Sequence, residues 1–244
     1  MSADKTTKRY PEVAEAGSLK EAILQQFSAV GSPLAATAPT REEFPVAYAR
    51  VEQGPRFSQI YLAAEERLFM PDYWDNGVCL AHGKSPDFSA IVTSVEQWVS
   101  GSAKSISELA KVFSFVALND GAGAHEDGTE TEAQWHGYLE GHRVSELHPD
   151  LPELVEAVSK QPKLRRLFPY TSMATFHFSR CTGYPFTRDT PWFQPIGDRR
   201  FRVLGALGRG QPGLGEGTAQ EVAQIAADEL PDDIPEAWVG TAET

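Results

Sequence analysis

The sequence predicts an α+β fold of two similar units, each an antiparallel strand meander followed by a helix, plus connecting helices. In the first half, short strand-like runs precede a stretch at 87–99 whose apolar residues have helical spacing. The same order returns in the second half, where strand-like runs at 174–181, 192–196 and 201–206 precede a helix at 218–230. The sequence similarity between the halves is slight, so the repeated order does not establish a duplication.

The first unit is expected at residues 18–118, after a polar stretch at 1–17 that lacks periodicity and is predicted to be a disordered tail. Ser18 and Glu21 have the spacing of a capping box, which predicts that a helix begins there. Strands are expected at the apolar runs 46–51, 57–63, 67–70 and 77–82.

A Gly-rich, acidic stretch at 119–131 is predicted to be a linker loop. The second unit is expected at 132–244, where helices at 132–140 and 151–159 precede the strands. The pair Thr218 and Glu221 again has capping-box spacing and predicts the start of the last long helix.

The composition is that of a globular protein, with 41% apolar and 23% charged residues and a net charge of −12. No apolar run is long enough to cross a membrane, and no secretory signal is visible, so a cytoplasmic protein is expected. Two cysteines make no disulfide framework. The acidic balance argues against nucleic acid as a partner.

Charge is distributed unevenly along the chain. Residues 163–209 include nine basic and two acidic residues, a net charge of +7, whereas the rest carries −19. We call residues 163–209 the basic segment. A local excess of charge of this kind indicates a binding partner or ligand rather than a fold.

The run 174–181, taken as a strand, alternates Phe176, Phe178 and Arg180 on one face with His177 and Cys181 on the other. His177 is the candidate for proton transfer, and Tyr184 is the second catalytic candidate. A pair of Cys181 and His177 is disfavoured, because four residues along a strand span roughly 13 Å.

An anionic group of a substrate is expected to bind Arg180 and Arg202, with Tyr184 and Trp192 packing against the ligand. The alternative is a sheet core with solvated arginines at its rim. Because an arginine cannot lose its charge, Arg180 needs an acceptor. The scarcity of acids in the basic segment indicates a ligand or a first-half acid such as Asp72 or Asp75, which are also substrate-binding candidates.

No metal and no cofactor are expected. Glu132, His136 and Glu140 share a helix face that could hold a divalent metal, but a solvated acidic face is the commoner outcome of such a pattern. The glycines at 205–217 match no phosphate-binding motif.

Several segments together carry a resemblance to a known family, and they span roughly residues 60–244. The segments are 73–78, 105–116, 167–172, 178–186 and 215–217. They resemble an actinobacterial family of natural-product biosynthesis proteins of unknown function. The resemblance implies a place in secondary metabolism and brings no catalytic residues with it.

We therefore expect an accessory or tailoring protein of natural-product biosynthesis that acts on a small-molecule or peptide intermediate with an anionic group. Other biosynthetic proteins are possible partners, and nucleic acid and membrane are not. The alternative is a non-catalytic peptide-binding or complex-forming partner subunit, whose charged surfaces would pair with those of another protein.

Overall fold

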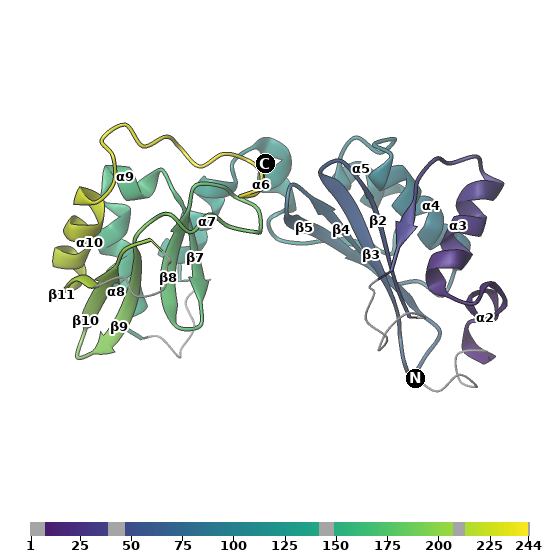
Figure 1. The fold of residues 1–244 in the computed structure, drawn as a ribbon, viewed down its shortest axis with the longest axis horizontal. Helices are drawn as coiled ribbons and strands as arrows, with labels where there is room; N and C mark the ends of the chain where they lie inside the picture. Colours follow the sequence, from purple (N-terminus) through teal and green to yellow (C-terminus); the bar gives the residue numbers. More distant parts are fainter. Residues whose placement is uncertain (1–7, 39–46, 142–148, 207–212, 244) are drawn as a thin grey trace. The chain divides into compact units, whose positions relative to one another are not determined.

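A computed structural model describes residues 8–38, 47–141, 149–206 and 213–243. The chain forms two compact units, Met1–Glu126 and Asp127–Thr244 (Figure 1). Each unit contains one antiparallel sheet followed by helices, which confirms the predicted α+β class with two strand meanders. The boundary between the units falls within the segment 119–131, the predicted linker, part of which forms helix α6 (Ala122–Asp127).

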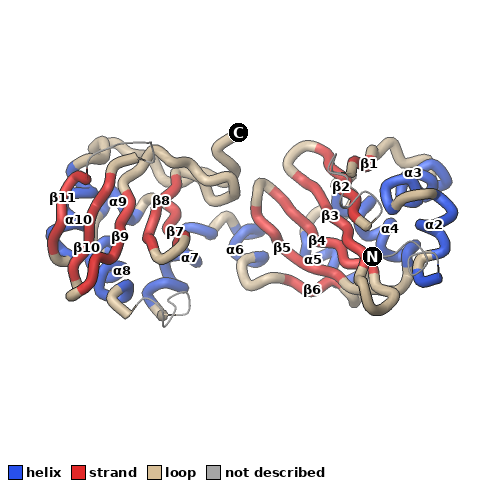
Figure 2. The backbone as a smooth tube through the Cα atoms, turned by 60° about the horizontal axis from the view of Figure 1, so that its bottom comes forward, coloured by secondary structure: helices blue, strands red, loops and turns tan. Residues whose placement is uncertain are grey.

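The sheet of the first unit has six antiparallel strands in sequential order. The strands are β1 (Ala36–Thr37), β2 (Tyr48–Gln53), β3 (Arg56–Leu62), β4 (Phe69–Asp75), β5 (Val78–Gly83) and β6 (Val116–Leu118). Side chains alternate between two faces in such strands. One face packs on helices, and Figure 2 shows strands of this unit passing in front of helical segments.

The helices of the first unit supply the other half of its core. They are α2 (Pro11–Ala16), α3 (Leu19–Ala29), α4 (Phe88–Val99) and α5 (Ile106–Val112). Asp87 caps α4, because its carboxylate accepts a hydrogen bond from the N–H of Ala90 at 3.0 Å. Trp98 and Val95 of α4 are each 1% exposed, so the helix buries one face against the sheet.

The predicted disordered tail at 1–17 is wrong for residues 11–16, which form α2. Tyr10 and Val13 are fully buried, and the Tyr10 hydroxyl lies 2.8 Å from the carbonyl oxygens of Ala63 and Glu66. Two apolar anchors in a polar stretch are too few to show a period, yet they are enough to fix one short helix against the sheet.

The second unit has a five-stranded antiparallel sheet in the order β11-β10-β9-β8-β7. Its strands are β7 (Phe168–Ser172), β8 (Thr175–Ser179), β9 (Trp192–Gly197), β10 (Arg200–Leu204) and β11 (Gly213–Gly217). Its helices are α7 (Glu130–Leu139), α8 (Leu151–Ser159), α9 (Pro162–Arg165) and α10 (Ala219–Asp228). In Figure 2 the strands of this unit also lie in front of its helices.

The core of the second unit joins the sheet to α7, α8 and α10. Phe176, Phe193 and Phe201 are fully buried, as is Trp135 of α7, whose indole N–H donates to the carbonyl oxygen of Leu167 at 3.0 Å. Every buried residue of this core lies between 135 and 234, so the second unit encloses an apolar core of its own.

The strand predicted at 174–181 is shorter, because β8 ends at Ser179. Beyond it the chain turns away and pairs with the C-terminal segment. Trp238 donates its backbone N–H to the carbonyl oxygen of Arg180 at 2.9 Å, and Thr182 donates to that of Trp238 at 3.0 Å. Arg180 is therefore outside the sheet and does not share a strand face with the core phenylalanines.

Among the helices that the structure describes, none has the length and apolar character required to cross a bilayer.

Candidate functional site

The face of the second sheet opposite the helices carries a row of stacked rings. His177 lies between Tyr170 and Trp192, with ring centroids 5.1 Å away on both sides and planes inclined by 17° and 10°. Phe186 extends the row beyond Tyr170 at 4.4 Å. Paired strands lie about 4.8 Å apart, so rings at opposed positions stack in this way.

His177 is nearly enclosed by this row. It is 6% exposed, and its Nε2 atom lies 2.6 Å from the hydroxyl of Thr175. Burial lowers the pKa of His177 to about 4, so the imidazole is neutral near pH 7. A base this weak is poorly matched to proton transfer, for which a pKa near the working pH is best.

Tyr184, the second catalytic candidate, lies at the other end of the row. It is 64% exposed, and its ring meets Phe186 edge to face at 6.0 Å. Phe186 and Tyr170 stand between it and His177. The structure thus places Tyr184, Trp192 and His177 in one aromatic row without bringing Tyr184 to the imidazole.

Arg180 has an acceptor within the basic segment. Its guanidinium lies 2.5 Å from the carboxylate of Asp189 and over the ring of Trp238 at 5.5 Å. The acceptor of this group is thus Asp189 and not a first-half acid, although the Nε atom of Arg180 is buried and has no acceptor among the described residues. The loop after β8 folds back, and the backbone N–H of Arg180 donates to the hydroxyl of Thr187 at 2.9 Å, which brings Asp189 close.

Arg202 is also paired. It lies opposite Glu216 in the β10–β11 register, with its Nε atom 2.6 Å from the carboxylate. Further ion pairs join cations of the basic segment to acids outside it: Lys163–Asp232, Arg165–Glu132 and Arg199–Glu153. Four cations of the basic segment are therefore paired with acids outside it.

Asp72 and Asp75 both lie in β4 and interact within the first unit. Asp75 lies 3.3 Å from Arg56 and 3.8 Å from His125. Asp72 accepts a hydrogen bond from the backbone N–H of Gln59 at 2.8 Å, and burial raises its pKa. Asp75 thus has a structural ion pair, whereas Asp72 is a buried carboxyl whose raised pKa makes it easier to protonate.

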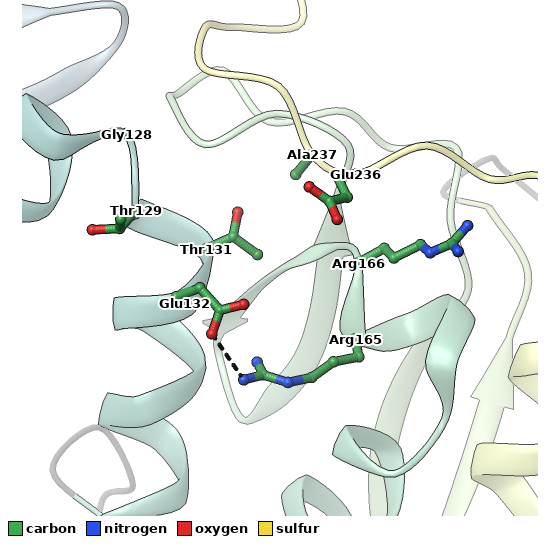
Figure 3. Close-up of a pocket in the computed structure, with 8 residues that line it drawn as sticks. All are labelled: Gly128, Thr129, Thr131, Glu132, Arg165, Arg166, Glu236 and Ala237. Carbon is green, nitrogen blue, oxygen red and sulfur yellow. Dashed lines mark hydrogen bonds and ion pairs between the residues drawn. The ribbon is translucent and has the colours of Figure 1, made fainter.

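A pocket of about 200 Å³ opens beside the start of α7 in the second unit (Figure 3). It is lined by Gly128, Thr129, Thr131, Glu132, Arg165, Arg166, Glu236 and Ala237. Figure 3 shows Arg165 reaching toward Glu132, whereas the side chain of Arg166 runs in the opposite direction. Arg166 donates to the carbonyl oxygen of Ile234 at 2.9 Å.

Arg165 is the least satisfied cation of this pocket. Its Nη2 atom lies 3.4 Å from the Glu132 carboxylate, at the outer limit of a hydrogen bond, and its guanidinium lies over the Trp135 ring at 5.0 Å. Its Nη1 atom is buried and has no hydrogen-bond acceptor among the described residues. An arginine cannot deprotonate, so this N–H group remains a donor and can bind an acceptor supplied by a ligand.

Sequence reasoning missed this pocket because its lining comes from three distant segments, 128–132, 165–166 and 236–237. Glu132 entered only as a metal-ligand candidate, and it pairs with Arg165 instead. Within the described ranges, no group of three or more His, Cys, Asp or Glu side chains is placed to hold a metal ion.

Residues 129–241 match the model of a family of unknown function (DUF6193). The matched range corresponds to the second unit and includes the pocket lining from Thr129 to Ala237. No curated protein and no solved structure matches the chain.

Proposed function

We propose that the second unit binds a small molecule or peptide with an anionic group in the pocket beside α7, and that its role is recognition rather than catalysis. The observation that carries this proposal is the buried Nη1 of Arg165, which has no acceptor among the described residues. A ligand carboxylate or phosphate would supply that acceptor in a charge-assisted hydrogen bond, which is stronger than a neutral one.

The carboxylates in the pocket lining indicate that the ligand also carries a positively charged group. Glu132 and Glu236 line the pocket together with the hydroxyl-bearing Thr131. Two carboxylates beside two arginines, of which Arg165 has the unpartnered Nη1 atom, suit a ligand that carries an amine as well as an acid. An amino-acid-like or peptide intermediate has both groups and is small enough for a pocket of about 200 Å³.

The catalytic candidates favour recognition over chemistry. His177 has a pKa lowered to about 4 by burial and is held between two rings. Cys181 is fully buried, and its thiol donates toward the carbonyl oxygen of Gly183 at 3.5 Å. The contacts of these side chains are those of packed residues, and neither provides an accessible nucleophile with a matched base.

The resemblance to natural-product biosynthesis proteins supports a role for this ligand binding in secondary metabolism. We propose an accessory protein that presents or protects a biosynthetic intermediate for enzymes of the same cytoplasmic pathway. Deletion of the gene followed by mass spectrometry of accumulating metabolites tests that placement. An unchanged metabolite profile contradicts it without bearing on whether the pocket binds ligands.

Binding itself is testable with probes that carry the proposed groups. We expect glycylglycine and acetate to shift the NMR signal of the Trp135 indole N–H, since Trp135 lies under Arg165. Arg165→Gln removes the charge and should weaken binding by roughly ten- to a hundredfold, because a hydrogen bond to a charged group contributes about 1.5–3 kcal/mol.

The matched control is Arg199→Gln, since Arg199 also pairs with a glutamate, Glu153, at 2.6 Å on the surface of the same unit. This variant should bind as the unaltered protein does. If glycylglycine and acetate leave the Trp135 signal unchanged up to high millimolar concentration, the pocket is not an anion site.

A further inference from the structure

The first unit holds a second group of reactive side chains, on the sheet face opposite its helices. Cys79 Sγ lies 3.7 Å from His82 Nε2, and both residues lie in β5. Asp72 of β4 lies directly opposite His82 in the register. A thiol, an imidazole and a carboxyl thus lie side by side, as groups do in sites of nucleophilic catalysis.

A β-bulge creates this arrangement. Residues three apart on a regular strand point to opposite faces. Here Cys79 opposes Trp74, whereas Ala81 opposes Tyr73, so Leu80 is an extra residue in β5. The extra residue turns His82 to the same face as Cys79. Bulges are over-represented next to active sites, where they re-aim a side chain.

We propose that Cys79 is a nucleophilic thiol that reacts with small carbon electrophiles, with His82 accepting its proton. In the tautomer with its proton on Nδ1, His82 can accept at Nε2. The thiol proton passes to Nε2, the sulfur forms a bond to carbon, and the leaving group departs with the electron pair of its bond. The imidazolium formed then faces Asp72 across the strand pair.

The surroundings explain why the thiol depends on His82. Burial and the charge of Asp72 raise the pKa of Cys79 to about 11, so the thiol is protonated at rest. Tyr61 and Tyr48 also lie on this face, and burial raises the pKa of both, that of Tyr61 to about 12, so both are neutral. Cys79 is half-buried and His82 is exposed, which leaves the pair open to a small reagent.

Iodoacetamide is a suitable probe, because alkylation forms a carbon–sulfur bond and releases iodide. Mass spectrometry of peptides reports each cysteine separately, and the fully buried Cys181 is an internal control. We expect Cys79 to be alkylated first. Near pH 8 its rate should exceed the rate that the small thiolate fraction of a thiol with this raised pKa allows.

His82→Gln should slow alkylation by at least about tenfold near pH 8, since a general base commonly contributes a hundredfold or more. Its rate should then rise steadily with pH. Asp72→Asn should speed the reaction at high pH, because the charge that raises the thiol pKa is gone. Melting curves establish that both variants are folded.

Two results would overturn the proposal. One is an alkylation rate of Cys79 near pH 8 that is no higher than that of the buried Cys181 in the unaltered protein, which needs no variant. The other is an equal rate in His82→Gln and in the unaltered protein across the pH range.

Discussion

The guanidinium of Arg180 lies 2.5 Å from the carboxylate of Asp189, nine residues further along the same loop. Both side chains are partly exposed, at 38% and 48%. Burial works against the charge of Asp189, but hydrogen bonds from Arg180 and Thr187 outweigh it and lower the pKa of this carboxyl. The pair therefore organises the loop after β8, while the buried Nε atom of Arg180 has no acceptor among the described residues.

Arg180→Gln is expected to lower the free energy of unfolding by about 1 kcal/mol, the value of an exposed ion pair with good geometry. A buried pair would cost several times more. Urea denaturation at pH 7 measures the loss, and Asp189→Asn should give a similar one. Because the pKa of Asp189 is lowered, the stability from this pair is present above its unfolded pKa and fades as the pH falls through the folded value.

A double-mutant cycle on Arg180 and Asp189 separates their coupling from other losses. Additive effects of the two substitutions would show that the pair contributes nothing, and that Arg180 acts through its contact with Trp238.

His177 gives the second unit a stability that depends on pH. Its pKa is lowered by burial from an ordinary value of 6.5 to about 4, so the unfolded state binds the proton more readily. Stability from the neutral imidazole is complete above about pH 6.5 and decreases as the pH falls toward 4. The pKa difference corresponds to about 3 kcal/mol.

His177→Phe keeps a ring between Tyr170 and Trp192 but removes the titration. The free energy of unfolding of this variant should depend less on pH between about 4 and 6.5 than that of the unaltered protein. Denaturation curves at several pH values measure the slope. An NMR titration that gave His177 an ordinary pKa would contradict the prediction directly.

Local signals in the sequence predicted the helices well. Ser18 and Thr218 cap α3 and α10 through their side chains, as the spacing of these residues indicated. Caps involve neighbours within four residues, so they can be recognised without knowing the fold. The strand meanders also follow from short apolar runs between turns.

Contacts between distant segments could not be predicted in the same way. Strand β11 is a glycine-rich run without alternating apolar residues, and its pairing with β10 defines it. The bulge at Leu80 is set by the register between β4 and β5, so the spacing of Cys79 and His82 along the chain does not reveal that they share a face. Asp189 is the acceptor of Arg180 because of the path of the loop between them, and a count of charges along the chain does not predict that path.

Tyr10 is expected to anchor the N-terminal helix. Its hydroxyl lies within hydrogen-bond distance of the carbonyl oxygens of Ala63 and Glu66 and accepts from the N–H of Leu68 at 3.2 Å. Tyr10→Phe leaves these groups without their partner and should cost about 1–3 kcal/mol. Thermal denaturation measures the loss. Tyr184→Phe, at an exposed hydroxyl, is the control and should change little.

The second unit is expected to fold without the first. Its buried apolar cluster runs from Trp135 to Ile234 and contains no residue of the first unit, whose own cluster ends at Ala122. A domain of this size with its own core can fold independently.

A fragment of residues 127–244 should therefore unfold cooperatively and show dispersed NMR signals, with the Trp135 indole N–H still bonded to Leu167. Phe178→Ala in this fragment should cost about 3–5 kcal/mol, because it removes a fully packed ring. A fragment that binds hydrophobic dyes and melts gradually would instead show that the unit needs residues before 127 for its specific packing.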